Sequence, residues 1–155
     1  MYILKVSFLI ALFIITIAFA EQKQESPEPI IITSQKLLHD SKNKTATFEG
    51  NVVAKRGDMT MQANKMIVYY YEDEQKGSKI RMIEAIGRVR LNRASRLITS
   101  EKAVYYPEPE ERVEFIGEPR ATDGKNLIIG EKITYFVKDD RSLVEKSKVY
   151  LKEKK

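Results

Sequence analysis

A segment that begins with glycine occurs three times in this chain of 155 residues. The glycines are Gly50, Gly87 and Gly117, which lie 37 and 30 residues apart. A lysine follows each glycine fifteen residues later, at Lys65, Lys102 and Lys132. An earlier partial copy precedes them, since residues 32–36 differ from residues 98–102 only in having glutamine in place of glutamate. Repeats of this period are typical of one supersecondary unit stacked on itself, so we look for function on the surface that the units build together.

Apolar and polar residues alternate along most of the chain from residue 30 onward, which is the pattern of strands with one buried face. Turn-forming residues separate the alternating runs at 56–58, 75–78, 107–109, 123–126 and 139–141. This spacing predicts an all-β sandwich, barrel or solenoid. A glycine inside a strand usually marks a bulge or a bend. Three glycines at matched positions therefore predict a folded sheet whose alternating apolar residues lie on the concave side.

Residues 1–20 have the features of a secretory signal. Lys5 is the only charged side chain, an uncharged run extends from Val6 to Ala20, and residues 18–20 form a small-x-small cleavage site. Residues 21–29 are polar and contain two prolines, which predicts a linker before a single domain at 30–155. A retained membrane anchor is the alternative, although the 15-residue run is shorter than the roughly 20 residues that span a bilayer. Both interpretations predict export.

The composition offers little chemistry to an enzyme. The chain has no cysteine, which excludes disulfides and thiolate sites, and His39 is its only histidine, near an expected turn. We therefore expect no catalytic residue, no metal ligand set and no cofactor. The formal net charge is +5, but lysines, arginines and acids are interspersed, whereas a nucleic-acid surface would be more one-sided. The small positive excess suits an anionic surface or head group better.

Aligned repeats place apolar residues at matching levels of one face: Met66 with Ile133, and Val68 with Tyr105 and Tyr135. Two interpretations stay open, a closed β core and an open apolar groove that holds an acyl chain. Each buried methylene contributes about 0.8 kcal/mol, so a tail of about 14 carbons would gain on the order of 10 kcal/mol in such a groove. A register slip of one residue would instead turn Met66 and Val68 outward and Ile67 inward with Tyr69.

Residues 46–54, the following glycine turn and residues 61–68 resemble the OstA-like repeat, which reads roughly A-x-F-x-G-N-V-x-V, a turn, then I-x-A-D-x-V-x-V. Residues 32–37 resemble the strand that opens this repeat. The family is that of the LptA/LptC-type lipopolysaccharide transport proteins, with the related N-terminal domain of LptD. The resemblance covers about residues 30–150. The later copies diverge, since Arg88 and Glu118 occupy the position of Asn51.

The resemblance implies a folded, V-shaped β-jelly-roll with an apolar inner groove for the acyl chains of lipid A. It implies a non-enzymatic periplasmic carrier that passes lipopolysaccharide from the inner to the outer membrane, after cleavage of its signal. The expected partners are lipopolysaccharide, other Lpt-type jelly rolls bound by edge-strand addition, and further copies of the chain in a head-to-tail oligomer. The groove-facing candidates are Phe48, Val52, Ala54, Met61, Met66, Val68, Tyr105, Phe115, Ile133 and Tyr135.

Three other functions are weighed against this one. The first is the membrane-anchored, LptC-like subunit of the same machine, which would keep its N-terminal segment. The second is a structural β-repeat interaction protein with a closed core and no lipid. The third, a glycan-modifying enzyme, has the least support, because no acid–base pair stands in a recognisable context.

Overall fold

The structure is a computed structural model that describes residues 28–153, and these residues form twelve strands and no helix. The expected signal segment and nearly all of the expected linker lie outside the described residues. The strands are β1 (Ile31–Thr33), β2 (Lys36–Asp40), β3 (Thr45–Arg56), β4 (Met59–Asp73), β5 (Gly77–Arg93), β6 (Arg96–Tyr106), β7 (Arg112–Ile116), β8 (Arg120–Asp123), β9 (Asn126–Ile129), β10 (Lys132–Phe136), β11 (Arg141–Glu145) and β12 (Lys148–Tyr150).

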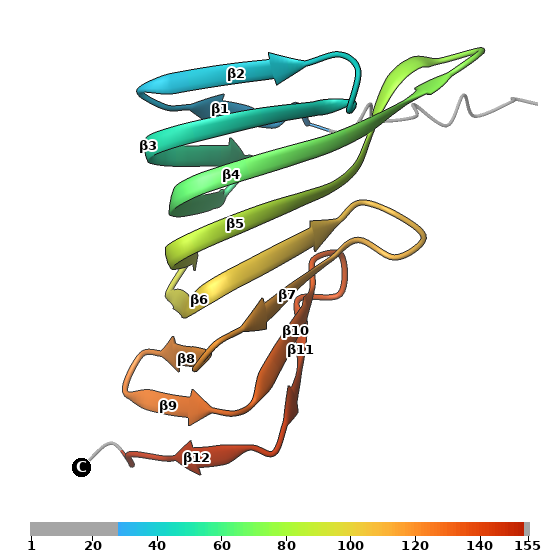
Figure 1. Ribbon diagram of the computed structural model, residues 1–155. Helices are drawn as coiled ribbons and strands as arrows, with labels where there is room; N and C mark the ends of the chain where they lie inside the picture. Colours follow the sequence, from blue (N-terminus) through green and yellow to red (C-terminus); the bar gives the residue numbers. More distant parts are fainter. Residues whose placement is uncertain (1–27, 154–155) are drawn as a thin grey trace, which may run out of the picture.

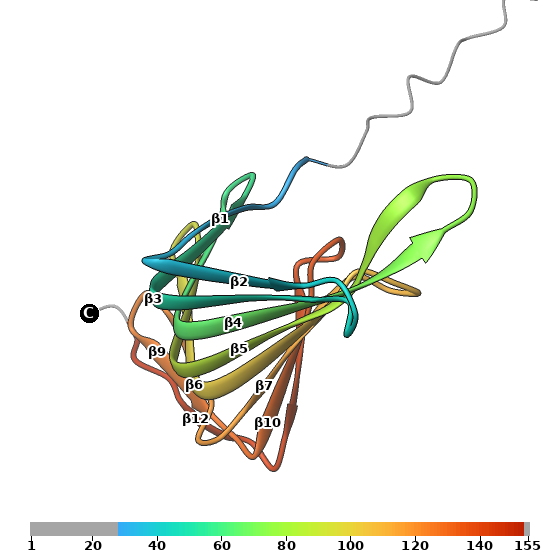
Figure 2. The ribbon, with the colours of Figure 1, turned by 45° about the horizontal axis from the view of Figure 1, so that its top comes forward.

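All strands pair antiparallel in one sheet that is folded into two arms (Figures 1 and 2). Strands β3, β4, β5 and β6 bend in the middle and contribute one half to each arm. In the first arm these halves lie between β2 at one edge and β7, β10 and β11 at the other. In the second arm they lie between β1 and the strands β8, β9 and β12. The result is a V-shaped, all-β jelly roll, as the resemblance to the family implies.

Each repeated glycine lies at a bend, which confirms the prediction made from their spacing. Gly50, Gly87 and Gly117 have φ angles of +83°, +80° and +83°, a backbone region that side chains with a Cβ rarely adopt. The register of β3 with β4 shifts across Gly50, and that of β5 with β6 shifts across Gly87. Such bulges increase local twist and turn the strand. Beyond the bend, the same two strands continue to pair in the second arm.

The glycines also leave room for a neighbouring side chain. A polar residue that directly precedes a lysine lies over the glycine of the adjacent strand. Gln35 of the partial first copy covers Gly50, Asn64 covers Gly87 and Glu101 covers Gly117. A Cβ added to any of these glycines would come within 2.4 to 2.8 Å of that side chain. The glycine and the polar residue of the repeat therefore contact each other across neighbouring strands.

A fourth bend occurs without glycine, between β11 and β12. Lys146 has a φ angle of +48° there. The Glu131 amide donates a hydrogen bond to the Glu145 carbonyl at 2.9 Å, as the Glu101 amide does to the Gly117 carbonyl at the same distance. The repeat thus continues through the C-terminal strands, although its glycine is missing.

The repeated lysines lie on the outer face of the first arm, opposite to the apolar face. Each pairs with a glutamate on a neighbouring strand: Lys65 with Glu49 at 3.1 Å, Lys102 with Glu84 at 2.8 Å, and Lys132 with Glu114 at 3.1 Å. Opposite charges across neighbouring strands contribute roughly 0.2–1 kcal/mol each. The repeated spacing of glycine and lysine therefore alternates a bend with an outer ion pair, while the inner face carries apolar residues.

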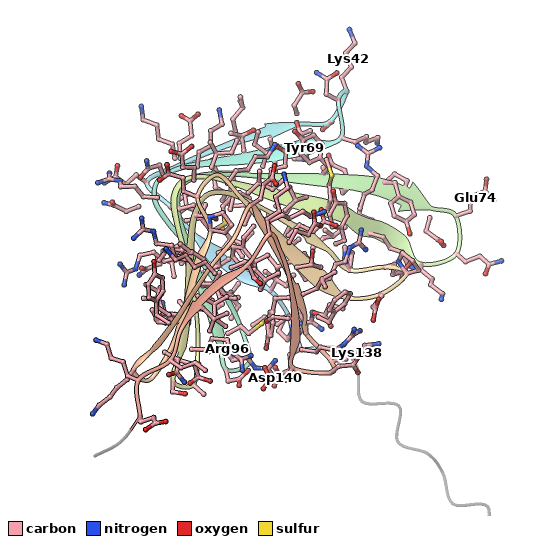
Figure 3. All side chains as sticks on the ribbon, turned by 90° about the horizontal axis from the view of Figure 1, so that it is seen from below. Lys42, Tyr69, Glu74, Arg96, Lys138 and Asp140 are labelled. Atoms are coloured by element: carbon pink, nitrogen blue, oxygen red, sulfur yellow. The ribbon has the colours of Figure 1, made fainter. Side chains whose placement is uncertain are left out.

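The hairpin of β4 and β5 extends beyond the neighbouring strands. Its paired residues run from Tyr70 opposite Ile80 to Asp73 opposite Gly77, past the last residues of β3 and β6 that pair with it. Glu74 lies at its tip, away from the body of the molecule (Figure 3). His39 in β2 packs against this hairpin, where its Nε2 lies 2.7 Å from the Tyr70 hydroxyl.

Candidate functional site

The inner faces of the two arms form one apolar cluster. Eight of the ten groove-facing candidates are buried within it: Val52, Met61, Met66, Val68, Tyr105, Phe115, Ile133 and Tyr135. The other two, Phe48 and Ala54, are partly buried and pack against it. Met66 is fully buried and Val68 is 8% exposed, while Ile67 and Tyr69 are more exposed, so the slipped register does not occur. The structure brings all ten residues together, and their part in binding a lipid stays a prediction.

Side chains fill most of the space between the arms. The remaining cavity has a volume of about 50 Å³. Methionines are prominent among its lining residues, which include Met59, Met61 and Met66 beside Ile83 and Leu91. Methionine is flexible and polarisable, so a wall built from it adapts to apolar groups of different shape.

A wider hollow of about 770 Å³ adjoins this cavity. Ile30, Arg56 and Tyr105 line both spaces, so these three residues separate the cavity from the hollow. Charged side chains line the hollow as well, among them Lys79 and Lys138. The site therefore consists of an apolar interior with a polar mouth.

A first cross-arm cluster, consisting of Arg56, Tyr105 and Glu111, joins the arms at this mouth. Arg56 ends β3 in the second arm, whereas Tyr105 and Glu111 belong to the outer end of the first arm. The Arg56 Nη1 donates to the Tyr105 hydroxyl at 2.8 Å and to the Glu111 carboxylate, and the Tyr105 hydroxyl donates to the same carboxylate at 3.1 Å. Burial raises the pKa of the Tyr105 hydroxyl to about 12, and the negative charge of Glu111 acts in the same direction.

A second cross-arm cluster, consisting of Arg93, Arg96, Tyr135 and Asp140, joins the arms further along the sheet. Arg93 Nη1 donates to the Tyr135 hydroxyl at 2.6 Å and to the carbonyl of Val137 at 3.0 Å. Arg96 Nη1 donates to Asp140 at 2.6 Å, and Figure 3 shows these two side chains next to each other. The hydrogen bond from the Tyr135 hydroxyl, with Arg96 nearby, lowers the pKa of Asp140.

The sequence did not single out the charged members of these two clusters. The sequence pattern assigns Arg56 and Asp140 only to turns, and it assigns no role to Arg93, Arg96 or Glu111. A signal is nevertheless present, because the sequence predicts that Tyr105 and Tyr135 point inward. A buried tyrosine hydroxyl usually needs a hydrogen-bond partner.

Other kinds of site find no support in the described residues. Between residues 28 and 153 there is no group of three acidic or histidine side chains close enough to hold a metal ion. The same part of the chain contains no helix of the length and apolarity needed to cross a bilayer.

Comparison with known proteins identifies related chains. A family model described as "LptA/(LptD N-terminal domain) LPS transport protein" matches residues 31–141. Among solved structures, the chain is similar to LptH from Pseudomonas aeruginosa, the LptA-homologous periplasmic component of that organism's lipopolysaccharide transport device. The TM-score is 0.69 at 16% sequence identity, and the match covers 81% of this chain and 96% of LptH, which establishes a common fold. None of the curated proteins matches the chain.

Proposed function

This chain belongs to the LptA and LptD N-terminal domain family of lipopolysaccharide transport proteins, and from this premise we propose that it is a non-enzymatic lipid carrier. It holds the acyl chains of lipopolysaccharide between its two arms and passes the lipid from the inner to the outer membrane. The observation that carries the proposal is the single apolar cluster that both arms share, from Val52 in β3 to Tyr135 in β10.

The polar mouth of the interior supports the proposal. Lipopolysaccharide combines apolar acyl chains with an anionic, hydroxyl-rich head group. Apolar chains gain free energy in the interior, about 0.8 kcal/mol for each buried methylene. Lys79 and Lys138 at the mouth offer positive charge to the head group, and the exposed Glu108 offers a hydrogen-bond acceptor to sugar hydroxyls.

The free edges of the sheet suit assembly by strand addition. At one edge, Leu37 of β2 is 60% exposed although it pairs with Phe48 of the inner face. At the other edge, Val144 of β11 packs against the apolar cluster, beside the 54% exposed Leu143. Exposed edge strands ordinarily invite pairing with another chain. We propose that other jelly rolls of this type, or further copies in a head-to-tail array, add here and continue the inner face.

The proposed location is the periplasm, where LptH acts as a transport component. It requires export by residues 1–20, followed by a linker at 21–29 and one domain at 30–155. Mass spectrometry of the exported protein tests this directly. An N-terminus near residue 21 agrees with a cleaved signal, and an intact N-terminus establishes the anchored, LptC-like subunit instead.

Site-specific photo-cross-linking to lipopolysaccharide tests the carrier function. A photo-reactive residue replaces Phe48, Met61 or Phe115 on the inner face, and Lys102 or Lys132 on the outer face serves as the control. We expect lipid adducts at the inner positions and none at the outer ones. If a folded protein gives no adducts at the inner positions, the structural β-repeat protein with a closed core is the better interpretation. The small volume of the cavity, about 50 Å³, is the observation that favours that second function.

A further inference from the structure

The interior of the chain is too small for an acyl chain as the structure stands. A cavity needs about 10–15 Å³ in this measure to hold one water molecule. The available 50 Å³ is therefore room for a few atoms and not for an extended tail. Since Met66, Phe115, Ile133 and Tyr135 are each essentially inaccessible to solvent, lipid uptake requires the arms to move apart.

The first cross-arm cluster lies where such a movement would begin. Arg56 and Tyr105 line both the apolar cavity and the outer hollow, and Glu111 lines the hollow. Glu111 is only 6% exposed, so the cross-arm hydrogen bonds from Arg56 and Tyr105 supply the donors that its buried carboxylate needs. A chain that passes from the hollow into the cavity passes Ile30, Arg56 and Tyr105, and Glu111 holds the last two by its hydrogen bonds.

The chemistry of the contact suits a closure that opens reversibly. Separation of the arms would expose the Arg56 guanidinium and the Glu111 carboxylate to water, which replaces their lost hydrogen bonds. An apolar seam would have no such replacement. The second cross-arm cluster does not border the cavity in this way, because its Tyr135 is fully buried and is not among the residues that line the cavity.

From these observations we propose that Arg56, Tyr105 and Glu111 form a gate that holds the arms together in the empty protein and opens when acyl chains enter. The inference rests on the proposed carrier function. The second cross-arm cluster keeps the C-terminal half of the arms together while the gate opens.

A reversible cross-link tests the gate. Because the chain has no cysteine, Arg56→Cys with Glu111→Cys provides a unique pair across the arms. A short bifunctional maleimide with a reducible disulfide in its linker joins the pair. The matched control is Ser95→Cys with Asp123→Cys, whose native side chains lie 2.8 Å apart within the second arm. Each protein carries a photo-reactive residue at Met61, and the readout is the adduct with purified lipopolysaccharide.

We expect the open cysteine pair to form adducts, the cross-linked pair to form none, and reduction of the linker to restore them. The control pair forms adducts in every state. Equal adducts in the cross-linked and open forms of the gate pair would overturn the gate and leave the carrier function standing. Absence of adducts in all forms, including the unmodified chain, would overturn the carrier function and the gate with it.

A second variant addresses the loss of structure that two cysteines could cause. Glu111→Gln keeps the shape of the side chain and removes its charge, so the fold is expected to persist by circular dichroism. Loss of a charge-assisted hydrogen bond should open the gate more often, and uptake should become about tenfold faster. An unchanged uptake rate in this folded variant would contradict the gate.

Discussion

Glu101 lies directly over Gly117, on neighbouring strands of the folded sheet. The Glu101 amide donates a hydrogen bond to the Gly117 carbonyl at 2.9 Å, and a Cβ on Gly117 would come within 2.8 Å of the Glu101 Cβ. The glycine thus meets two requirements at once, a φ angle of +83° and space for the next strand. Gly50 and Gly87 meet the same two requirements at their bends.

Replacement of this glycine should therefore cost more than backbone strain alone. Gly117→Ala places a side chain in an unfavourable backbone region, which costs about 1–2 kcal/mol. Overlap with Glu101 adds about 1–3 kcal/mol, as overpacking does elsewhere. Urea denaturation monitored by circular dichroism measures the sum as a loss of unfolding free energy.

The matched control for this prediction is Gly77→Ala. Gly77 has a similar φ angle of +74°, but nothing lies within 4 Å of the position of its missing Cβ. We expect the control to lose only the backbone contribution. Equal losses in the two variants would show that contact with Glu101 is not what requires glycine at the bend.

The bends and the inner face could be predicted from the sequence because both follow local rules. The bends are predicted from the glycines at matched positions once the repeat is recognised. Alternation with period two assigns Met66 and Val68 to one face. The bend before Lys146 could not be predicted, because Glu145 occupies the position that glycine has in the other repeats.

The cross-arm contacts could not be predicted for a different physical reason. Arg56 and Glu111 lie 55 positions apart in the sequence, and they meet only because the bends fold the sheet so that the two arms face each other. Whether the interior is open or filled also depends on the distance between the arms, which no repeat pattern specifies. The inward tyrosines indicate only that polar partners exist, since the buried hydroxyl of Tyr105 needs a hydrogen-bond partner.

Stability should fall at alkaline pH because of Tyr105. Its pKa is raised to about 12 in the folded chain, above the ordinary value near 10. The folded state therefore holds the proton more tightly than the unfolded state does. The contribution of Tyr105 is fully present below pH 10 and is lost as the pH rises toward 12.

The variant Tyr105→Phe tests this dependence. At neutral pH the variant should be less stable by about 0.5–1.5 kcal/mol, because Arg56 and Glu111 lose a hydrogen-bond partner. Between pH 10 and 12 its unfolding free energy should decline less steeply than that of the unmodified chain. Urea midpoints at several pH values give both quantities. Parallel decline in the two proteins would assign the alkaline loss to other groups.

The outer ion pairs should contribute at acid pH. A hydrogen bond from Lys102, with a second from Tyr69, lowers the pKa of Glu84 below its ordinary value of 4.5. Its contribution is therefore present above pH 4.5 and is lost as the pH falls through the lowered value. Because the Lys102 side chain is 44% exposed, the effect should not exceed about 1 kcal/mol.

Glu84→Gln should remove this acid dependence and should also reduce the sensitivity of stability to salt. Glu72→Gln is the control, because the pair of Glu72 with Lys44 spans 3.7 Å and both side chains are about half exposed. Thermal melts at neutral and acid pH compare the two variants. If Glu72→Gln changes the loss of stability at acid pH as much as Glu84→Gln does, the outer lysine–glutamate ion pairs have no special role.

Self-association should depend on the edge strand β2. Leu37 is 60% exposed and pairs only with β3 among the described residues, so its inner face is open at the end of the sheet. Leu37→Glu places a charge on this edge, a device by which natural sheets prevent strand addition. The monomer should lose little stability, since the side chain is already largely in water.

Ile116→Glu is the control, because Ile116 is 44% exposed on β7, between β6 and β10. Sedimentation velocity over a wide concentration range should show larger species for the unmodified chain and for Ile116→Glu, and monomers for Leu37→Glu. Larger species in all three proteins would move the contact away from this edge, whereas an unmodified chain that stays monomeric would contradict head-to-tail assembly of the chain with itself.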